Sequence, residues 1–495
     1  MMAGDRFDVI VVGGGPAGAT MSWALARQGI NVAVLERTRF PREKVCGDFV
    51  EPAGLRLIRV MGCDAALDGP TRLPITANRV YFGPHLAYRN TIPYYDGQHG
   101  QPRHSLIIPR AELDAMLLQN AEDTGATVLM ATEAGAVRRE DGTNQVDIRC
   151  GDATRSLSAP LVIGADGFES LVGRSAGLQR RDRRHIGIAR RMYLEGVEVD
   201  AGETTIWFDE DHIPGYGWMF PMPGGRANFG IGVLSESADR FGLSVPKIFG
   251  ESLARLRLRH PGCRNARAAS KPLGGVVKAY GGIDRNHFHG GLLIGDAGSF
   301  VDPITGEGIT QGMESAIIAS RTVVAALAAG RFDADFLGRY DTEFRAHFDP
   351  SMLYVGFCAA IMRNWHFREI LWRVTRRGFE RANADPEFGR VAGAGFGGVD
   401  VQPRAILIQL WTAVFGHLAR GGVDAVSALL AGRAPGGGAH DMLGDLGAWH
   451  RGWQASIADD AAWHYAWLAD VARAFARMGP ALATTENPRV RGLEI

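Results

Sequence analysis

The first forty residues constrain the fold more than any other part of this chain. "FDVIVVGGGPAGATMSWALARQGINVAVLER", which begins at Phe7, predicts a strand, a tight turn, a helix and a second strand. Phe7 to Val12 is a nearly continuous apolar run, as in strands that are buried on both faces of a parallel sheet. Gly13, Gly15 and Gly18 follow directly in the spacing G-x-G-x-x-G. This context indicates a dinucleotide-binding unit.

Each glycine of this turn has its own predicted task in a Rossmann-like α/β fold. Gly13 permits the tight turn, Gly15 lets a pyrophosphate approach the backbone, and Gly18 allows the helix to pack closely on the strand. Glu36 ends the second strand, where its carboxylate can hold ribose hydroxyls and would repel a 2′-phosphate. FAD or NAD therefore fits better than NADP. The nucleotide site predicted from this unit comprises Gly13, Gly15, Ala17, Gly18, Glu36 and Arg37.

Two later segments place a carboxylate at the end of an apolar strand. "PLVIGADGFES" puts Asp166 after one strand, and "GGLLIGDAGSFVDPITGEGI" puts Gly295 and Asp296 after another. The carboxyl ends of parallel strands form the edge where open α/β sheets bind ligands. Each segment alone could be a turn with a helix cap, but together with the first unit they indicate a single dinucleotide site.

These three segments resemble the FAD motifs of flavoproteins related to p-hydroxybenzoate hydroxylase. The resemblance implies that Asp166 lies near the nucleotide, that Asp296 binds the ribityl chain, and that the following loop brings backbone N–H groups to the flavin ring. Arg110 in "IIPRAELDAMLL" matches a flavin-contacting arginine, although an exposed arginine at a helix start is an alternative. The residues that the resemblance assigns to FAD are Arg110, Asp166, Gly295, Asp296, Pro303, Gly306, Gly308 and Ile309.

The segment "PREKVCGD" resembles the geranylgeranyl reductase family within these flavoproteins. It matches the family pattern P-x-x-K-x-C-G at Pro41, Lys44, Cys46 and Gly47. Its ending resembles actinobacterial menaquinone side-chain reductases more than archaeal lipid reductases, which usually have glycine at the position of Asp48. The resemblance covers roughly residues 5–330.

A second family segment, "PGYGWMFPMP", resembles Y-x-W-x-F-P through Tyr216, Trp218 and Phe220. The resemblance implies that these aromatic residues line a substrate cavity, and ordinary core packing is the alternative.

Cys46, with Lys44 and Gly47, is the predicted catalytic group. The loop is expected to carry Cys46 toward the flavin ring and the substrate, where a thiol can donate a proton or shape the cavity. A buried, structurally inert cysteine is the alternative. The chain shows no metal-ligand pattern, because its cysteines are far apart and form no C-x-x-C pair. They are Cys46, Cys63, Cys150, Cys263 and Cys358.

The remaining sequence predicts three regions. Residues 1–70, 106–180 and 276–330 form the FAD-binding domain. Residues 71–105 and 181–275, rich in short alternating strands, form an inserted antiparallel β-sheet that binds the substrate. Residues 331–495 form a helical region that holds seven of the ten tryptophans. The spacing of Trp449, Trp453, Trp463 and Trp467 is compatible with one helical face, which either packs on the flavin domains or forms a lid.

Composition limits the partners. Lys plus Arg and Asp plus Glu each number 54, so no basic field would attract nucleic acid. The N-terminus lacks the pattern of a signal peptide, and the longest apolar run, 405–419, is shorter than the roughly 20 residues of a membrane span. We therefore expect a cytoplasmic protein, with reversible contact of its aromatic C-terminal region with a membrane left open.

The sequence predicts an FAD-dependent oxidoreductase that reduces a carbon–carbon double bond of a hydrophobic, isoprenoid-type substrate. A flavin-dependent monooxygenase or epoxidase is the main alternative. Halogenation is disfavoured, because "PREKVCGD" replaces the lysine-containing G-E-S loop of flavin halogenases. An electron-transfer flavoprotein lacks support, since no cysteine cluster for an iron–sulfur centre is present. No second G-x-G-x-x-G follows a strand, so NAD(P)H or a reductase partner is expected to deliver electrons transiently.

Overall fold

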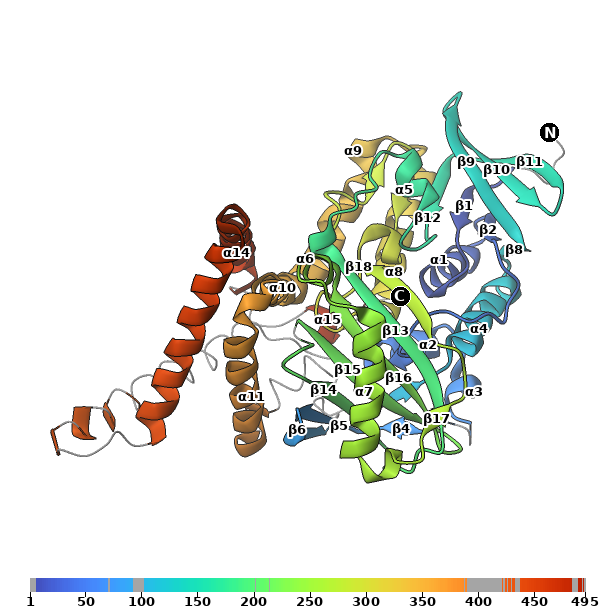
Figure 1. Cartoon of the computed structure of the whole chain (residues 1–495). Coiled ribbons are helices and arrows are strands. Elements are labelled where there is room, and N and C mark those ends of the chain that lie inside the picture. Colours follow the sequence, from blue (N-terminus) through green and yellow to red (C-terminus); the bar gives the residue numbers. More distant parts are fainter. Residues whose placement is uncertain are drawn as a thin grey trace.

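The computed structural model describes residues 6–495 with the exception of 70–71, 92–101, 201, 213, 387, 390–420, 422, 425, 429, 432–436, 483–487, 492 and 494–495. The apolar run 405–419 therefore lies outside the described residues. Two large sheets occupy different halves of the molecule, and long helices of the C-terminal region lie beside them (Figure 1).

The first half is built on a six-stranded sheet with β1 near its centre. Its strands, in spatial order, are β19 (His287–Phe288), β20 (Gly291–Leu293), β12 (Leu161–Gly164), β1 (Val9–Val12), β2 (Val32–Glu36) and β8 (Thr127–Met130). All neighbouring pairs are parallel except β19 with β20. The carboxyl ends of β1, β12 and β20 therefore meet at one edge, and the predicted Rossmann-like α/β fold is confirmed.

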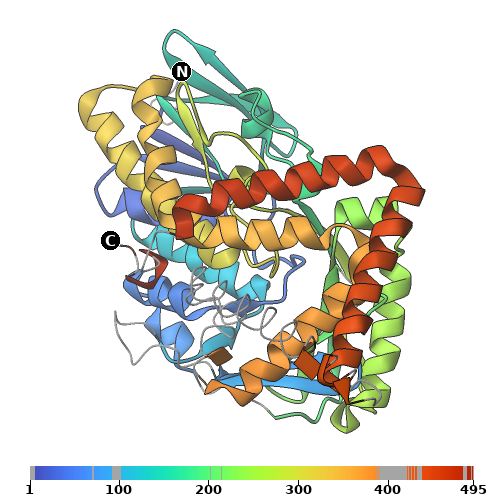
Figure 2. The ribbon, with the colours of Figure 1, turned by 90° about the vertical axis from the view of Figure 1, so that its left-hand side faces the viewer.

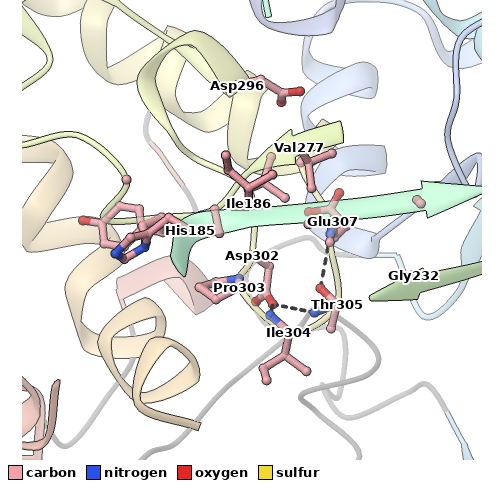
Figure 3. A pocket seen from close by; sticks show the side chains of 18 of the residues that line it. His185, Ile186, Gly232, Val277, Asp296, Asp302, Pro303, Ile304, Thr305 and Glu307 are labelled. Atoms are coloured by element: carbon pink, nitrogen blue, oxygen red, sulfur yellow. Dashed lines mark hydrogen bonds between the residues drawn. The ribbon is translucent and has the colours of Figure 1, made fainter. Parts of the chain in front are cut away.

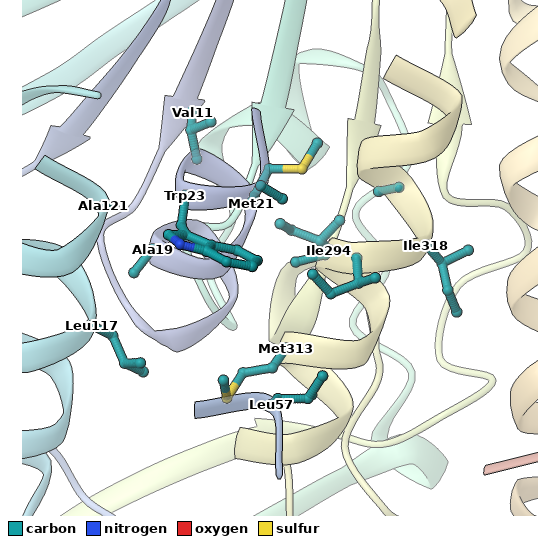
Figure 4. Packing of buried hydrophobic residues seen from close by; sticks show 14 of the residues in the cluster. Val11, Ala19, Met21, Trp23, Leu57, Leu117, Ala121, Ile294, Met313 and Ile318 are labelled. Atoms are coloured by element: carbon teal, nitrogen blue, oxygen red, sulfur yellow. The ribbon is translucent and has the colours of Figure 1, made fainter. Parts of the chain in front are cut away.

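Three helices cover one face of this sheet with apolar side chains. The helix α1 (Pro16–Ala26) packs between α4 (Arg110–Asp123) and α8 (Ile309–Ala329). Figure 4 shows Trp23 of α1 surrounded by neighbours from this cluster, Leu117 and Met313 among them. Each large apolar side chain buried here stabilises the fold by about 1.5–3 kcal/mol.

The helix α8 is also apolar and long enough to cross a membrane, the only such helix in the described part of the chain. In the fold, 67% of its most apolar window is buried. Its hydropathy is therefore accounted for by packing against α1 in the core.

The second half contains an eight-stranded sheet. Its strands are β5 (Ala77–Phe82), β6 (His85–Thr91), β13 (Ile186–Glu195), β14 (Glu203–Phe208), β15 (Gly215–Met222), β16 (Arg226–Leu234), β17 (Arg267–Ala268) and β18 (Leu273–Lys278). It is antiparallel except where β14 pairs with β5. The predicted inserted antiparallel sheet is confirmed, whereas the domain boundaries stay predictions.

One face of this second sheet is closed by the helix α7 (Val245–Arg259), whose Phe249 contacts Phe229 of β16. Side chains two residues apart share a face of a strand, so Tyr216, Trp218 and Phe220 of β15 share one face. Trp218 lies over Gly230 of β16, where an added Cβ would approach the indole within 2.2 Å.

Two small sheets complete the described strands. One joins β9 (Thr132–Glu140), β10 (Thr143–Cys150) and β11 (Ala153–Ala159) and has no counterpart in the sequence-based prediction. The other joins β3 (Phe49–Val50), β7 (Ser105–Ile107) and β4 (Pro74–Ile75). It anchors the residues that follow Cys46, because β3 begins three positions after it.

The described part of the C-terminal region is largely helical, as predicted. Its main helices are α10 (Arg339–Met362), α11 (Arg368–Ala384), α14 (Gly437–Leu482) and the short α15 (Pro488–Arg491). The helix α14 runs beside α10 and α11 and bends sharply at Asp460, which has extended dihedral angles (Figure 2). The bend lies between Trp453 and Trp463, so the four tryptophans do not share one continuous helical face. Trp467 is buried and Trp449 is half exposed.

Candidate active site

A cavity of about 860 Å³ lies where the two halves meet, and residues of both line it (Figure 3). This volume is near the upper end for small-molecule pockets. The structure brings most of the predicted site residues to its wall. They are Gly15, Ala17, Arg37, Lys44, Cys46, Gly47, Arg110, Tyr216, Trp218, Phe220, Gly295, Asp296, Pro303, Gly306, Gly308 and Ile309.

Two predicted glycines lie behind the wall and serve the packing of the chain on itself. Gly13 has φ +104°, and an added Cβ would lie 2.3 Å from the carbonyl oxygen of Ala165. An added Cβ at Gly18 would lie 1.8 Å from the carbonyl oxygen of Gly13. These positions therefore require glycine whether or not a ligand is bound.

The carboxylates of Glu36 and Asp166 are also behind the wall. Glu36 accepts hydrogen bonds from the backbone N–H of Gly14 (3.0 Å) and of Thr38 (2.9 Å). Asp166 Oδ2 accepts hydrogen bonds from the backbone N–H of Leu171 (2.6 Å) and Val172 (3.3 Å), and its Oδ1 is buried without a partner. Both residues thus hold the turns that follow β2 and β12 in place.

Two helix N-termini open on the cavity with features that suit FAD. The helices α1 and α8 start after Gly15 and Gly308, which have no side chain to cap the first turn, and in α8 Glu307 accepts one hydrogen bond from the backbone N–H of Thr310. An added Cβ at Gly15 would have only Arg42 Nη2 within 4 Å, at 3.8 Å, so the protein leaves space above this glycine. Free N–H groups at a helix N-terminus attract phosphate and other anions. The residues present therefore fit a dinucleotide that carries a pyrophosphate and a reducible ring.

The described residues contain one acidic group with the spacing of a metal site, Asp209 with Asp211 and His212. Arg255 donates to both aspartates, at 3.0 and 2.8 Å, and Arg259 donates to Asp209 at 2.6 Å. Arginine already supplies the positive charge there.

Side chains of β13 and β16 hold the loop that carries Cys46. The fully buried Arg191 donates to the carboxylate of Glu43 (2.6 Å) and to the carbonyl oxygen of Lys44 (2.8 Å). Asn228 Nδ2 donates to the carbonyl oxygen of Cys46 (2.9 Å). The loop is thus fixed to a sheet that lies far away in the sequence.

Asp48 joins several segments of the site through hydrogen bonds, a role that was not predicted from the sequence. It is fully buried, and its φ of 62° lies in the left-handed region, which favours glycine. Its carboxylate accepts hydrogen bonds from the hydroxyl of Tyr193 (2.7 Å), Asn228 Nδ2 (2.8 Å) and the backbone N–H of Arg110 (3.3 Å). Burial raises the pKa of Asp48 to about 6, against the effect of the first two of these hydrogen bonds. Glycine adopts a positive φ without steric cost, so the backbone at position 48 would also accept glycine.

The surroundings of the Cys46 side chain favour the protonated thiol over the thiolate. Its Sγ accepts a hydrogen bond from the backbone N–H of Asp48 (3.3 Å). Burial raises the pKa of Cys46, although the nearby Arg110 opposes the shift. A protonated sulfur at neutral pH is compatible with a proton donor and unfavourable for a thiolate nucleophile.

Two cations lie beside Cys46. Lys44, two positions before Cys46, lines the cavity as an exposed residue. Arg110 binds Asp114 through two hydrogen bonds of 2.7 and 2.8 Å, and Asp114 also pairs with Arg42 at 3.0 Å. Arg110 is 7% exposed, so the alternative of an exposed arginine at a helix start is wrong. It lies in the cavity wall.

The two segments that resemble the geranylgeranyl reductases meet in the structure. An added Cβ at Gly47 would lie 2.9 Å from the ring of Phe220 and 3.6 Å from Trp218 Nε1. Phe49 extends the aromatic wall, with its ring centroid 5.4 Å from that of Phe220. Gly47 therefore gives the cysteine loop room to lie against this wall, which is the role the geometry supports for it.

Further polar residues at the cavity escaped sequence reasoning. Glu51 and Glu307 both line it, and each has one buried carboxylate oxygen without a hydrogen-bond partner. Behind the wall, between the lining residues Val277 and Ala279, Lys278 is buried; its Nζ lacks a hydrogen-bond partner and lies 5.6 Å from the centroid of the Phe168 ring, and burial lowers its pKa to about 8. Glu307 stands within the G-E-G of the third motif, but neither Glu51 nor Lys278 belongs to any pattern in the sequence.

Comparisons with known proteins agree with this geometry. Residues 6–350 match the family model of the FAD binding domain. The menaquinone reductase of Mycobacterium tuberculosis is 32% identical over 65% of this chain and 77% of its own length. Digeranylgeranylglycerophospholipid reductase 2 of Methanothermobacter thermautotrophicus is 32% identical over 69% of this chain and 83% of its own length.

The fold also resembles a solved structure. A geranylgeranyl bacteriochlorophyll reductase-like protein from Thermoplasma acidophilum aligns with a TM-score of 0.64 and 24% identity, over 77% of this chain and 91% of its own. The described C-terminal helices extend beyond residue 350, where the family model ends. On the sequence matches, this chain belongs to the geranylgeranyl reductase family of FAD-dependent oxidoreductases.

Proposed function

We propose that this protein uses FAD to reduce a carbon–carbon double bond in the isoprenoid chain of a hydrophobic substrate. One observation carries the proposal: a single cavity is lined by the motif residues assigned to FAD, by the Cys46 thiol and by an aromatic wall. The names of the relatives, which refer to menaquinone and to geranylgeranyl lipids, support an isoprenoid chain as the substrate.

Gly15, Asp296 and Gly308 are proposed to hold the cofactor through its pyrophosphate, its ribityl chain and its ring. Bound and reduced FAD supplies a hydride from ring nitrogen N5. The protein must add a proton to the other alkene carbon, because an unpaired carbanion or carbocation is too costly.

The wall of Tyr216, Trp218 and Phe220 is proposed to orient the apolar chain and exclude water. Water exclusion strengthens the electrostatic interactions within the site. The Cys46 thiol lies beside this wall as a proton donor or as a side chain that shapes the cavity.

Electron delivery and location belong to the same proposal. NAD(P)H or a reductase protein delivers electrons transiently, and the enzyme works in the cytoplasm. Leu443, Leu446 and Trp449 of α14 are exposed apolar residues, which supports reversible contact with a membrane that holds the substrate.

Rapid mixing tests the reaction class. The flavin is photoreduced without oxygen and is mixed with menaquinol, whose ring is already reduced, or with a geranylgeranyl glycerolipid, and flavin reoxidation is followed by absorbance. We expect the alkene to reoxidise the flavin in the absence of oxygen. If only oxygen reoxidises the flavin, through an absorbing C4a adduct, the protein is a monooxygenase and the reductase proposal fails.

A further inference from the structure

Four buried or half-buried carboxyl groups lie beside the cavity, and few of the described cations face them. Its members are Glu51 before α2 (Pro52–Val60), Asp302 and Glu307 in the loop before α8, and Glu314 within α8. One guanidinium, that of Arg489 in α15, faces them from the C-terminal end of the chain. His347 of α10 faces Glu314 at 3.5 Å.

Two of these carboxyl groups are well satisfied. Glu314 pairs with Arg489 Nε at 2.9 Å, and the guanidinium also lies 5.7 Å from the centroid of the Phe348 ring. Asp302 Oδ1 accepts hydrogen bonds from the backbone N–H of Ile304 and of Thr305, each at 2.8 Å (Figure 3). Both can remain ionised, because each has close donors.

Glu51 and Glu307 are left without such support. Arg489 approaches Glu51 Oε2 only to 3.9 Å, and this oxygen has no hydrogen-bond partner. Glu307 Oε1 accepts one hydrogen bond from the backbone N–H of Thr310 (3.0 Å), and its Oε2 has none. Two neighbouring carboxyl groups with so few hydrogen-bond donors are costly to ionise together.

The two residues are brought together by the contact of α2 with α8. An added Cβ at Gly54, one turn after Glu51, would lie 2.7 Å from Thr310 Oγ1. Thr310 is the residue whose N–H binds Glu307. Burial raises the pKa of Glu51, and the nearby charge of Glu307 raises it further. Burial also raises the pKa of Glu307, to about 7.

The carboxyl pair faces the same part of the cavity as the thiol. The hydroxyl of Tyr216 donates to the carbonyl oxygen of Thr305, two residues before Glu307. Burial raises the pKa of Tyr216, and Asp302, Cys46 and Glu307 raise it further. Tyr216 therefore contacts the loop that carries Glu307, and it lines the same cavity as Cys46 and Glu51.

We propose that Glu51 and Glu307 share one proton and are the internal acid that protonates the substrate, which leaves the Cys46 thiol the role of shaping the cavity. This inference rests on the proposed function. A hydride from reduced FAD forms one new C–H bond, and a proton from the pair forms the other. The alkene is reduced, the flavin is oxidised, and the pair is left with one more negative charge until solvent restores the proton.

Infrared spectroscopy tests the shared proton without turnover. The FAD-loaded protein should show the C=O stretch of a protonated carboxylic acid that persists near pH 7, where ordinary carboxyl groups have ionised. Glu51→Gln and Glu307→Gln should each weaken this band, and Glu343→Gln, at an exposed position of α10, should leave it unchanged. If the wild-type protein has no such band, the proposal is wrong.

Kinetics test the use of the proton. In anaerobic mixing with menaquinol, whose ring cannot accept electrons, Glu51→Gln and Glu307→Gln should each slow alkene-dependent reoxidation by about 10²–10⁴-fold, the usual contribution of general acid catalysis. The wild-type rate should fall as the pH rises through about 7, where Glu307 loses its proton.

Variants that keep the wild-type rate and pH profile overturn the proton-source proposal even if the infrared band is present. That result leaves the reductase function intact, because wild-type protein would still be reoxidised by the alkene. Failure of the wild-type protein to react with any alkene instead removes the proposed function itself.

Discussion

The cavity has two sides that are built in different ways. The nucleotide side, residues 13–18 with 295–296 and 303–309, relies on backbone turns, glycine contacts and helix N-termini that begin after glycine. The thiol side, residues 41–51 with Tyr193, Tyr216, Trp218, Phe220 and Asn228, relies on side chains from distant parts of the chain. Asp48 binds Tyr193 and Asn228 across 145 and 180 positions of sequence. Binding of the cofactor is thus a property of local turns, and placement of the thiol is a property of the whole fold.

The largest effect should come from glycines of the nucleotide side. Gly18→Ala places a Cβ 1.8 Å from a backbone oxygen, so we expect loss of soluble folded protein. An added Cβ at Gly15 would have only Arg42 Nη2 within 4 Å. Gly15→Val should therefore keep the fold but lose FAD through a clash with the pyrophosphate. Circular dichroism and flavin absorbance separate the two results.

Asp296→Ala should also reduce FAD occupancy, since it removes the proposed partner of the ribityl chain. Full flavin content in both Gly15→Val and Asp296→Ala would show that the cofactor site is assigned wrongly.

Replacement of the Cys46 thiol should give the next largest effect, and it should change catalysis rather than folding or FAD binding. Cys46→Ser is nearly isosteric and should retain the fold and FAD, but turnover should fall by about 10²–10⁴-fold if the thiol donates a proton. A smaller loss with altered substrate preference indicates a side chain that shapes the cavity. Cys150→Ser, at an exposed position, is the matched control.

An unchanged rate per bound flavin in Cys46→Ser, together with a lower melting temperature, would instead identify an inert structural cysteine.

The buried pair of Arg489 and Glu314 should affect stability. Arg489→Gln leaves Glu314 uncompensated and should lower the free energy of unfolding by about 3–5 kcal/mol. The double variant with Glu314→Gln should recover part of this loss. Arg149→Gln breaks an exposed pair with Glu133 and should cost no more than about 1 kcal/mol in denaturant titrations. If Arg489→Gln and Arg149→Gln lowered the free energy of unfolding by the same amount, the pair of Arg489 and Glu314 would not be a buried contact that stabilises the fold.

The hydrogen bond from Tyr193 to Asp48 should give the smallest effect. Tyr193→Phe removes one donor from a buried carboxylate and should lower the free energy of unfolding by about 1.5–3 kcal/mol. Tyr465→Phe, at a residue that is 57% exposed, should be neutral. A neutral Tyr193→Phe would mean that the cysteine loop is held by its other contacts.

The same contrast explains what the sequence could predict. Gly13, Gly15 and Gly18 were recognisable because a turn between a strand and a helix leaves its pattern within a few residues. Cys46 and the Tyr216 segment were recognised only through resemblance to a family, and their contact through Gly47 is a product of the tertiary fold.

Other features left no local pattern at all. Asp48 adopts a positive φ that its residue type does not suggest, and Arg489 reaches Glu314 across 175 positions. The four tryptophans of α14 were compatible with one face only for an unbroken helix, and Asp460 breaks it.

The mass of the product tests the central claim most directly. Protein reduced without oxygen is incubated with menaquinol, and the product is extracted, its ring fully reoxidised, and analysed by mass spectrometry. We expect a gain of two hydrogen atoms in the isoprenoid side chain, in an amount equal to the flavin oxidised. Recovery of an unchanged side chain without oxygen, with an added oxygen atom when air is admitted, would contradict this account and identify a monooxygenase.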